Sequence, residues 1–334
     1  MRALLSNEPG GPDTLRVERV PDPEPGPGEL LVRVRACAIN YPDVLIIEDK
    51  YQMRPPRPFA PGGEIAGEVE AVGEGVEGWT PGDRVIAVTG YGGLAEKMVI
   101  PAGAAFRLPD GRSFAEGSAL LLTYATSIHA LVDRGRLATD QTLLVLGAAG
   151  GVGLAAVELG KAHGARVVAA VSSDDKAEAA RAAGADEAIV YPRGPFDREG
   201  QKALAQLFKD AVGPAGADVI FDPVGGDYAE PALRAIGWEG RYLVVGFPAG
   251  IPKLPLNLTL LKSCDVCGVF WGAFAARDRQ ANSAHVARLF LLWDEGKIRP
   301  RISATYPLER AGEAITALRD RNAIGKLVVT MDGS

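Results

Sequence analysis

The chain has 334 residues, of which 47% are hydrophobic and 23% charged, a composition typical of a folded protein with more than one domain. Its formal net charge of −6 offers no basic surface for nucleic acid or for an anionic membrane, so we expect neither as a partner. No apolar run approaches the roughly 20 residues that span a bilayer, and the first residues lack the apolar core of a signal peptide, so we expect a cytoplasmic protein.

The first third of the chain is predicted to be rich in β-strands. Apolar and charged residues alternate over 30–36, which is the pattern of a half-buried strand, and further strands are predicted over 65–73 and 84–88. Turns rich in glycine and proline separate these strands.

From about residue 124 the pattern changes to an alternation of strands and helices. Strands are predicted to end near Leu146, Val171, Val190, Phe221, Val245 and Phe270, with helices over 154–163, 176–183, 202–211 and 229–236 and a loop from Phe247 to Cys264. This alternation indicates an α/β fold with a doubly wound parallel sheet.

The last part of the chain is predicted to return to the first domain. A helix over 282–295, a helix over 311–321 and a strand over 326–330 follow the last strand of the α/β pattern. We therefore expect a β-rich domain of residues 1–123 and 272–334, interrupted by an α/β domain of residues 124–271.

A glycine cluster directly after the apolar run 143–146 carries the strongest functional signal. Ala148, Gly150 and Gly153 form the pattern A-x-G-x-x-G between a predicted strand and a predicted helix, as in a dinucleotide-binding loop. Gly150 would let the backbone approach a pyrophosphate, Gly153 would let the helix pack closely on the strand, and the helix N-terminus would attract the phosphates. The alternative is a glycine turn that serves packing alone.

The end of the next predicted strand favours NADP(H) over NAD(H). Val171 stands where an NAD-binding protein carries a carboxylate for the ribose, and Ser172, Ser173 and Lys176 supply hydroxyls and an ammonium that suit a 2′-phosphate. Two aspartates between them suit a helix N-terminus better than a nearby phosphate. The alternative is a serine N-cap on an ordinary solvated helix.

Short motifs along nearly the whole chain resemble those of one protein family. They are Asn40, the segments 61–67, 82–85 and 124–130, the glycine loop, the segments 221–226 and 268–273, and Gly325-Lys326. In order and spacing they resemble the zinc-free medium-chain dehydrogenases/reductases, and within them the NADPH:quinone oxidoreductase (zeta-crystallin-like) family. This resemblance implies a GroES-like catalytic domain interrupted by a Rossmann domain with a six-stranded parallel sheet, an active site between the two, and a homodimer formed through the edge strand 266–270.

No metal ion is expected. In the zinc dehydrogenases of the same superfamily a cysteine stands at the position of Asn40 and a histidine at that of Gly63, and neither asparagine nor glycine is a useful zinc ligand. Glu64 alone is no site, the segment 90–115 contains no cysteine, and the C-x-x-C pair at 264–267 has no second ligand pair. Without a Lewis acid, the expected reaction is hydride transfer from NADPH to a quinone or conjugated enone, because such an acceptor delocalises its own negative charge.

Asn40, Tyr41 and Tyr51 are the candidate catalytic residues. The Asn40 amide could donate a hydrogen bond to a substrate oxygen. A resemblance to 2-enoyl reductases places an active-site tyrosine in the segment 48–52, where the Tyr51 phenol would polarise a carbonyl or relay a proton. For each tyrosine the alternative is packing with an ordinary hydrogen bond.

The resemblance also implies which residues contact NADPH. The pyrophosphate would be held by Gly150, Gly151 and Val152, and the 2′-phosphate by Ser173 and Lys176. The other expected cofactor contacts are Thr126, Tyr191, Gly246, Phe247, Phe270, Trp271, Gly272 and Lys326.

Two other functions stay open at this point. One is a 2-enoyl thioester (enoyl-CoA) reductase, which Tyr51 favours, although no basic cluster that would bind the phosphates of CoA is evident. The other is a protein that binds NADPH without catalysis.

Overall fold

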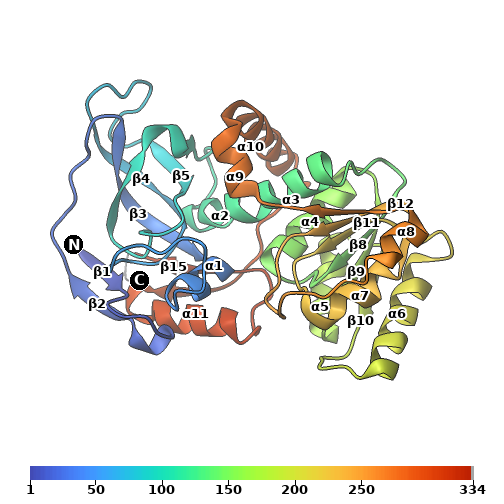
Figure 1. The fold of residues 1–334 in the computed structure, drawn as a ribbon. Helices are drawn as coiled ribbons and strands as arrows, with labels where there is room; N and C mark the ends of the chain where they lie inside the picture. Colours follow the sequence, from blue (N-terminus) through green and yellow to red (C-terminus); the bar gives the residue numbers. More distant parts are fainter. Residues whose placement is uncertain (332–334) are drawn as a thin grey trace. The chain divides into compact units, whose positions relative to one another are not determined.

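The computed structural model describes residues 1–331, which form two compact units (Figure 1). The first unit contains Met1–Leu122 and the segment from Pro300 onward, and the second contains Thr123–Arg299. The chain therefore passes between the units at 122/123 and at 299/300. The domain boundaries expected above, 123/124 and 271/272, stay a prediction.

The first unit is built on a seven-stranded sheet with the order β14-β15-β3-β4-β5-β7, and β6 pairs with β3 beside this path. Its strands are β3 (Glu29–Ile39), β4 (Glu64–Val72), β5 (Arg84–Val88), β6 (Lys97–Pro101), β7 (Ala105–Arg107), β14 (Ile302–Pro307) and β15 (Lys326–Thr330). A separate antiparallel pair is formed by β1 (Arg2–Leu5) and β2 (Arg16–Arg19). The helical elements are η1 (Pro12–Thr14), α1 (Tyr41–Ile46), η2 (Ala102–Ala104), α2 (Phe114–Ser118), η6 (Leu308–Arg310) and α11 (Ala311–Arg319).

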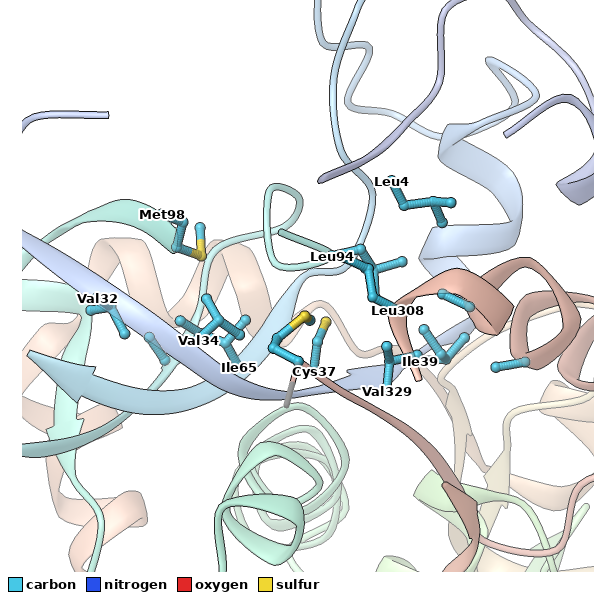
Figure 2. Close-up of a cluster of buried hydrophobic side chains, with 14 of the residues drawn as sticks. Leu4, Val32, Val34, Cys37, Ile39, Ile65, Leu94, Met98, Leu308 and Val329 are labelled. Atoms are coloured by element: carbon cyan, nitrogen blue, oxygen red, sulfur yellow. The ribbon is translucent and has the colours of Figure 1, made fainter. Parts of the chain in front are cut away.

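The central strand β3 runs past its predicted end at residue 36. Leu327, Val328 and Val329 of β15 pair with its last residues, and sequence periodicity does not reveal a partner so far along the chain. A register shift after Val34 changes which residues point inward, so that Val32 and Val34 share one buried cluster with Cys37 and Ile39 (Figure 2).

The second unit contains a six-stranded sheet with the order β10-β9-β8-β11-β12-β13, in which every neighbouring pair is parallel. Its strands are β8 (Thr142–Leu146), β9 (Arg166–Val171), β10 (Glu187–Val190), β11 (Ala217–Asp222), β12 (Ile236–Val244) and β13 (Asp265–Gly268). The chain order reverses between β8 and β11, which is the switch point of a doubly wound sheet. The predicted Rossmann architecture is confirmed.

Helices connect the strands of this sheet. They are α4 (Gly151–Ala162), α5 (Asp174–Ala182), α6 (Arg198–Val212), η5 (Gly226–Tyr228), α7 (Ala229–Leu233) and α8 (Asn257–Lys262). Earlier in the chain than the first strand of this sheet are the π-helical segments η3 (Leu121–Ala125) and η4 (His129–Arg134), with α3 (Thr126–Ile128) between them. Later in the chain than its last strand are α9 (Trp271–Arg277) and α10 (Arg279–Asp294).

Three predicted elements of the second unit were wrong in extent. The helix expected over 229–236 ends at Leu233, because Ile236 already pairs with Ala217 of β11. The connection expected as a loop from Phe247 to Cys264 contains the helix α8. The sixth strand ends at Gly268, and Phe270 precedes the first turn of α9.

Within residues 1–331 no helix is long and apolar enough to cross a membrane.

Candidate functional site

In the glycine loop between β8 and α4, Gly150 and Gly153 have different surroundings. A Cβ atom at Gly153 would lie 2.3 Å from the carbonyl oxygen of Gly147, so Gly153 is needed for the close packing of α4 on the end of β8. At Gly150 the backbone is extended, with φ −75° and ψ 170°, and a Cβ would meet only the Gly147 oxygen, at 3.5 Å. Among residues 1–331 neither backbone strain nor packing requires a glycine at this position, so the expected contact of Gly150 with a pyrophosphate stays a prediction.

The first turn of α4 lies directly beside this open position. Gly150 precedes the helix and has no side chain that could cap the N–H groups of the first turn, which include those of Gly151 and Val152. The Ser127 hydroxyl of α3 donates to the carbonyl of Val152 over 3.0 Å and so holds α3 against this turn. Thr126 is partly exposed next to Ser127, and sequence reasoning had not selected Ser127.

The residues expected to bind a 2′-phosphate come together after β9. Ser173 precedes α5, its hydroxyl donates to the Asp175 carboxylate, and this hydrogen bond is the main cause that lowers the pKa of Asp175. The Lys176 ammonium lies 3.3 Å from the Ser172 hydroxyl. The first turn of α5 therefore presents two hydroxyls and an ammonium, with the aspartate already bonded to one hydroxyl.

Tyr191 follows β10 and is a buried core residue. Its ring centroid lies 5.1 Å from that of Tyr228 and 6.2 Å from that of Phe208. Its backbone N–H donates to the carbonyl of Val171 over 2.8 Å, which ties the end of β10 to the end of β9. Its expected contact with the adenosine stays a prediction.

Aromatic residues follow the ends of β12 and β13, and they differ in how exposed they are. Phe247 and Phe270 are 46% and 60% exposed, whereas Trp271 is buried and its indole N–H donates to the Asn282 side chain over 2.9 Å. Gly246 and Gly272 flank them. Phe247 and Phe270 are thus available for contact with a ligand, and Trp271 packs within its own unit.

Asp222 at the end of β11 was not selected from the sequence as a site residue. Its carboxylate is buried and accepts hydrogen bonds from the N–H groups of Val224 and Gly225, at 2.8 and 2.9 Å, and from the Tyr242 hydroxyl. Burial raises the pKa of Asp222. The carboxylate fixes the turn after β11, beside the switch point of the sheet.

The first unit holds a buried polar cluster of Asn40, Glu64 and Lys326. The Asn40 side-chain NH₂ group donates to Glu64 Oε2 over 3.0 Å and to the Ala38 carbonyl over 3.2 Å. The Lys326 ammonium donates to the Asn40 side-chain oxygen and to Glu64 Oε2, the latter over 3.0 Å. Glu64 Oε1 accepts the N–H of Leu122 over 2.8 Å. Three elements, β3, β4 and β15, are held together by one ion pair and its hydrogen bonds.

This arrangement bears on the role expected for Asn40. Both N–H bonds of its amide are already used within the protein, so the expected donation to a substrate oxygen stays a prediction that would require one of these two bonds to break. Lys326 has three N–H bonds, and within residues 1–331 its ammonium contacts two acceptors. The remaining donor of the cluster is therefore Lys326, for which the family resemblance implies a contact with the cofactor.

Asp43 is a second buried carboxylate close to this cluster. It accepts the N–H groups of Asn40 over 2.7 Å and of Gly62 over 2.9 Å. Burial raises the pKa of Asp43 to about 6, against the effect of these two hydrogen bonds. The carboxylate fixes the chain where it leaves β3 and enters α1.

Tyr41 and Tyr51 lie at the edge of the same core and are partly exposed. Within the described chain neither hydroxyl has a hydrogen-bond partner in this structure. Burial, followed by the nearby charge of Asp43, raises the pKa of Tyr51, so its phenol is protonated at neutral pH. The structure therefore brings Asn40 and Lys326 together and leaves both tyrosine hydroxyls outside their hydrogen-bond network.

The side chains around Asn40 do not suit a zinc ion. A Cβ atom at Gly63 would lie 2.9 Å from the backbone of Gly90, so a histidine at this position would displace the neighbouring turn. The Glu64 carboxylate already pairs with the Lys326 ammonium. Among residues 1–331 no three His, Cys, Asp or Glu side chains gather as a metal site.

Comparison with known proteins shows two family matches. The model of the family described as "Alcohol dehydrogenase GroES-like domain" matches residues 26–110, and that described as "Zinc-binding dehydrogenase" matches residues 151–288.

Similar proteins cover nearly the whole chain. "Quinone oxidoreductase-like protein 2 homolog" of Nematostella vectensis is 36% identical over 98% of this chain and 88% of its own length. The human "Synaptic vesicle membrane protein VAT-1 homolog" is 31% identical over 98% of this chain and 86% of its own. The solved structure of Escherichia coli quinone oxidoreductase complexed with NADPH is 28% identical, with a TM-score of 0.90, over 99% of this chain and 100% of that one. The chain therefore belongs to the zinc-free quinone oxidoreductase family of the medium-chain dehydrogenase/reductase superfamily.

Proposed function

We propose that this protein is an NADPH-dependent oxidoreductase that transfers hydride, without a metal ion, to a quinone or a conjugated enone. The observation that supports the proposal is the glycine loop. A Cβ atom at Gly150 would meet only one backbone oxygen, at 3.5 Å, and Gly150 lies directly before the first turn of α4, whose N–H groups have no side-chain cap. The E. coli relative that was solved with NADPH supports the choice of cofactor.

The second unit fits NADPH at two places. Gly150, Gly151 and Val152 would hold the pyrophosphate through backbone N–H groups, which need no side chain. Ser173 and Lys176 would bind the 2′-phosphate at the first turn of α5, where a carboxylate at the tip of β9 is replaced by Val171. The bound cofactor supplies the hydride.

Lys326 is the residue that we propose to meet the acceptor oxygen. Reduction of a quinone or enone places negative charge on an oxygen atom, and a buried ammonium with a remaining N–H bond stabilises it. Glu64 and Asn40 hold this ammonium in place by accepting its other two N–H bonds. A delocalised phenolate or enolate then needs no Lewis acid.

A 2-enoyl thioester reductase is the second candidate, because of Tyr51. Its hydroxyl lacks a partner within residues 1–331, and its raised pKa keeps it protonated, so it could donate a proton to the reduced product. A basic cluster for the CoA phosphates is not evident in the sequence, which favours the quinone.

We also propose a homodimer through the second unit. The strand β13 is at the edge of the sheet, and apolar side chains are exposed on it and on the neighbouring α8, namely Val266, Leu260 and Leu261. Covering this edge with a second copy would pair its backbone and bury these side chains. A light-scattering mass near that of one chain would contradict the dimer.

The test is NADPH oxidation with an ortho-quinone and with a short 2-enoyl-CoA, each repeated with NADH. We expect turnover with the quinone and NADPH, and a Lys176→Ala variant that loses the preference for NADPH over NADH. Lys202→Ala is the matched control, since Lys202 is exposed on α6 and its ion pair with Glu199 is on the same helix. Turnover with the thioester alone would replace the proposal by the second candidate. Binding of NADPH without oxidation by either acceptor would replace it by a non-catalytic role.

A further inference from the structure

The Glu158 carboxylate of the second unit accepts hydrogen bonds from two segments of the chain. Each segment lies next to one of the two places, called passages here, where the chain crosses between the units. The Tyr124 hydroxyl, two residues after the passage at 122/123, donates to Glu158 Oε2 over 2.6 Å. The backbone N–H of Arg299, the last residue before the passage at 299/300, donates to the same oxygen over 2.9 Å. These two segments lie 175 residues apart in the sequence (124 to 299) and share one acceptor atom.

The surroundings of Glu158 make this contact sensitive to protonation. The groups that act on its carboxyl are the Tyr124 hydroxyl from η3 and the N–H and charge of Arg299, and the Arg299 charge is the weakest of them. Burial outweighs all three and raises the pKa of Glu158 to about 7. The pKa of Tyr124 is raised well above its usual value, so this phenol stays a donor.

Glu158 is also part of the helix that begins at the glycine loop. It lies on α4, eight residues after Gly150 (150 to 158), which corresponds to about 12 Å along the helix axis. The first turn of α4 is held by Ser127, and its later turns hold Tyr124 and Arg299. Both passages are thereby fastened to the helix that we propose to bind the pyrophosphate.

We propose that Glu158 is a positioning residue that fastens the two chain passages to α4, and that its ionisation loosens them. This proposal rests on the proposed function only for its effect on turnover. The direction follows from the raised pKa: opening the contact exposes the carboxyl to water, where it ionises more readily, so a rise in pH toward 7 favours the opened form. Because the pKa of Glu158 is about 7 in the closed form and 4.5 for an ordinary glutamate, the opened population rises by up to about sevenfold per pH unit between about pH 5 and pH 7. Above pH 7 it levels off, since the closed form is then ionised as well.

Amide hydrogen exchange tests the fastening without any acceptor. We expect the protection factor of the Arg299 amide, corrected for intrinsic exchange, to fall by about sevenfold from pH 5 to pH 6 in the native protein. In Glu158→Gln the amide oxygen still accepts both hydrogen bonds but does not ionise, so protection should stay constant over this range. A constant protection factor in the native protein, or an equal fall in Glu158→Gln, would overturn the proposal.

Turnover tests the positioning role separately. Glu158→Leu removes the acceptor, and we expect kcat to fall by about tenfold while the dissociation constant of NADPH changes less than twofold; Glu158→Gln should recover most of kcat. Tyr124→Phe, which keeps the ring, should show an intermediate kcat if Glu158→Leu fails to fold. Unchanged kcat in all three variants would refute the positioning role. Failure of the proposed function would instead appear as a native protein without turnover, in which the exchange result still reports on the fastening.

Discussion

Removal of the Lys326 ammonium is the sharpest test of the cluster in the first unit. Lys326→Met keeps the length and apolar part of the side chain but leaves the Glu64 carboxylate, which is fully buried, without its cation at 3.0 Å. Breaking a buried ion pair in this way destabilises a protein by about 3–5 kcal/mol. For a unit of this size that corresponds to a fall in Tm of roughly 6–20 °C.

Calorimetry of three variants isolates this effect. Lys202→Met removes an exposed lysine and should lower stability by less than about 1 kcal/mol. The double variant Glu64→Gln/Lys326→Met removes both charges of this ion pair, so it should be more stable than Lys326→Met alone. A Lys326→Met protein that melts within 1 °C (about one half kcal/mol or less) of the native one would refute the reasoning, as would a double variant that melts no higher than the single one.

The remaining predictions concern the cofactor loop, the acceptor, the pH dependence and the dimer. Gly150→Ala should keep the native Tm but weaken NADPH binding, measured by NADPH fluorescence, by tenfold or more. Gly153→Ala, whose Cβ would lie 2.3 Å from a carbonyl oxygen, should lower stability by about 1–3 kcal/mol in thermal unfolding. Equal losses of stability in both variants would contradict the separate roles of the two glycines. In Lys326→Arg, which keeps the positive charge at the cluster, kcat with a quinone should exceed that of Lys326→Met by about 10²–10³-fold, and equal rates in steady-state assays would remove Lys326 from the mechanism. Burial raises the pKa of Asp43 to about 6, above its ordinary value of 3.8, so the native state binds the proton more tightly than the unfolded state. This contribution to stability is present below pH 4 and is lost as the pH rises through 6. In denaturant titrations, the unfolding free energy of Asp43→Asn should therefore decline less than that of the native protein between pH 4 and 6, by about 2 kcal/mol. Val266→Lys at the edge strand should halve the mass measured by light scattering, and an unchanged dimer mass would place the interface elsewhere.

Local patterns were sufficient to predict most of the fold. The alternation over 30–36 and the apolar runs before Leu146 and Val171 predicted strands that the structure contains, because burial of one or both faces of a strand leaves a direct mark on neighbouring residues. The glycine loop was predicted with its packing role for Gly153, since this role depends only on the strand, the turn and the helix that follow one another in the chain.

Contacts between distant segments decided the rest. The end of β3 depends on its pairing with β15, and the end of α7 depends on the pairing of Ile236 with Ala217. In both places pairing with a distant strand determines where the element ends, and the local hydrophobic pattern does not show it. The sequence showed Asn40, Glu64 and Lys326 as separate residues, and only the fold showed that they bind one another and that both N–H bonds of Asn40 are used. The shared oxygen of Glu158 had no signal in the sequence, because a glutamate on a helix is ordinarily exposed, and its role depends on two partners that the fold brings from opposite ends of the second unit. The sequence by itself thus determined most of the elements and the family, because both depend on neighbouring residues and on short motifs. The tertiary structure decided which polar groups are buried together, because their partners come from distant parts of the chain.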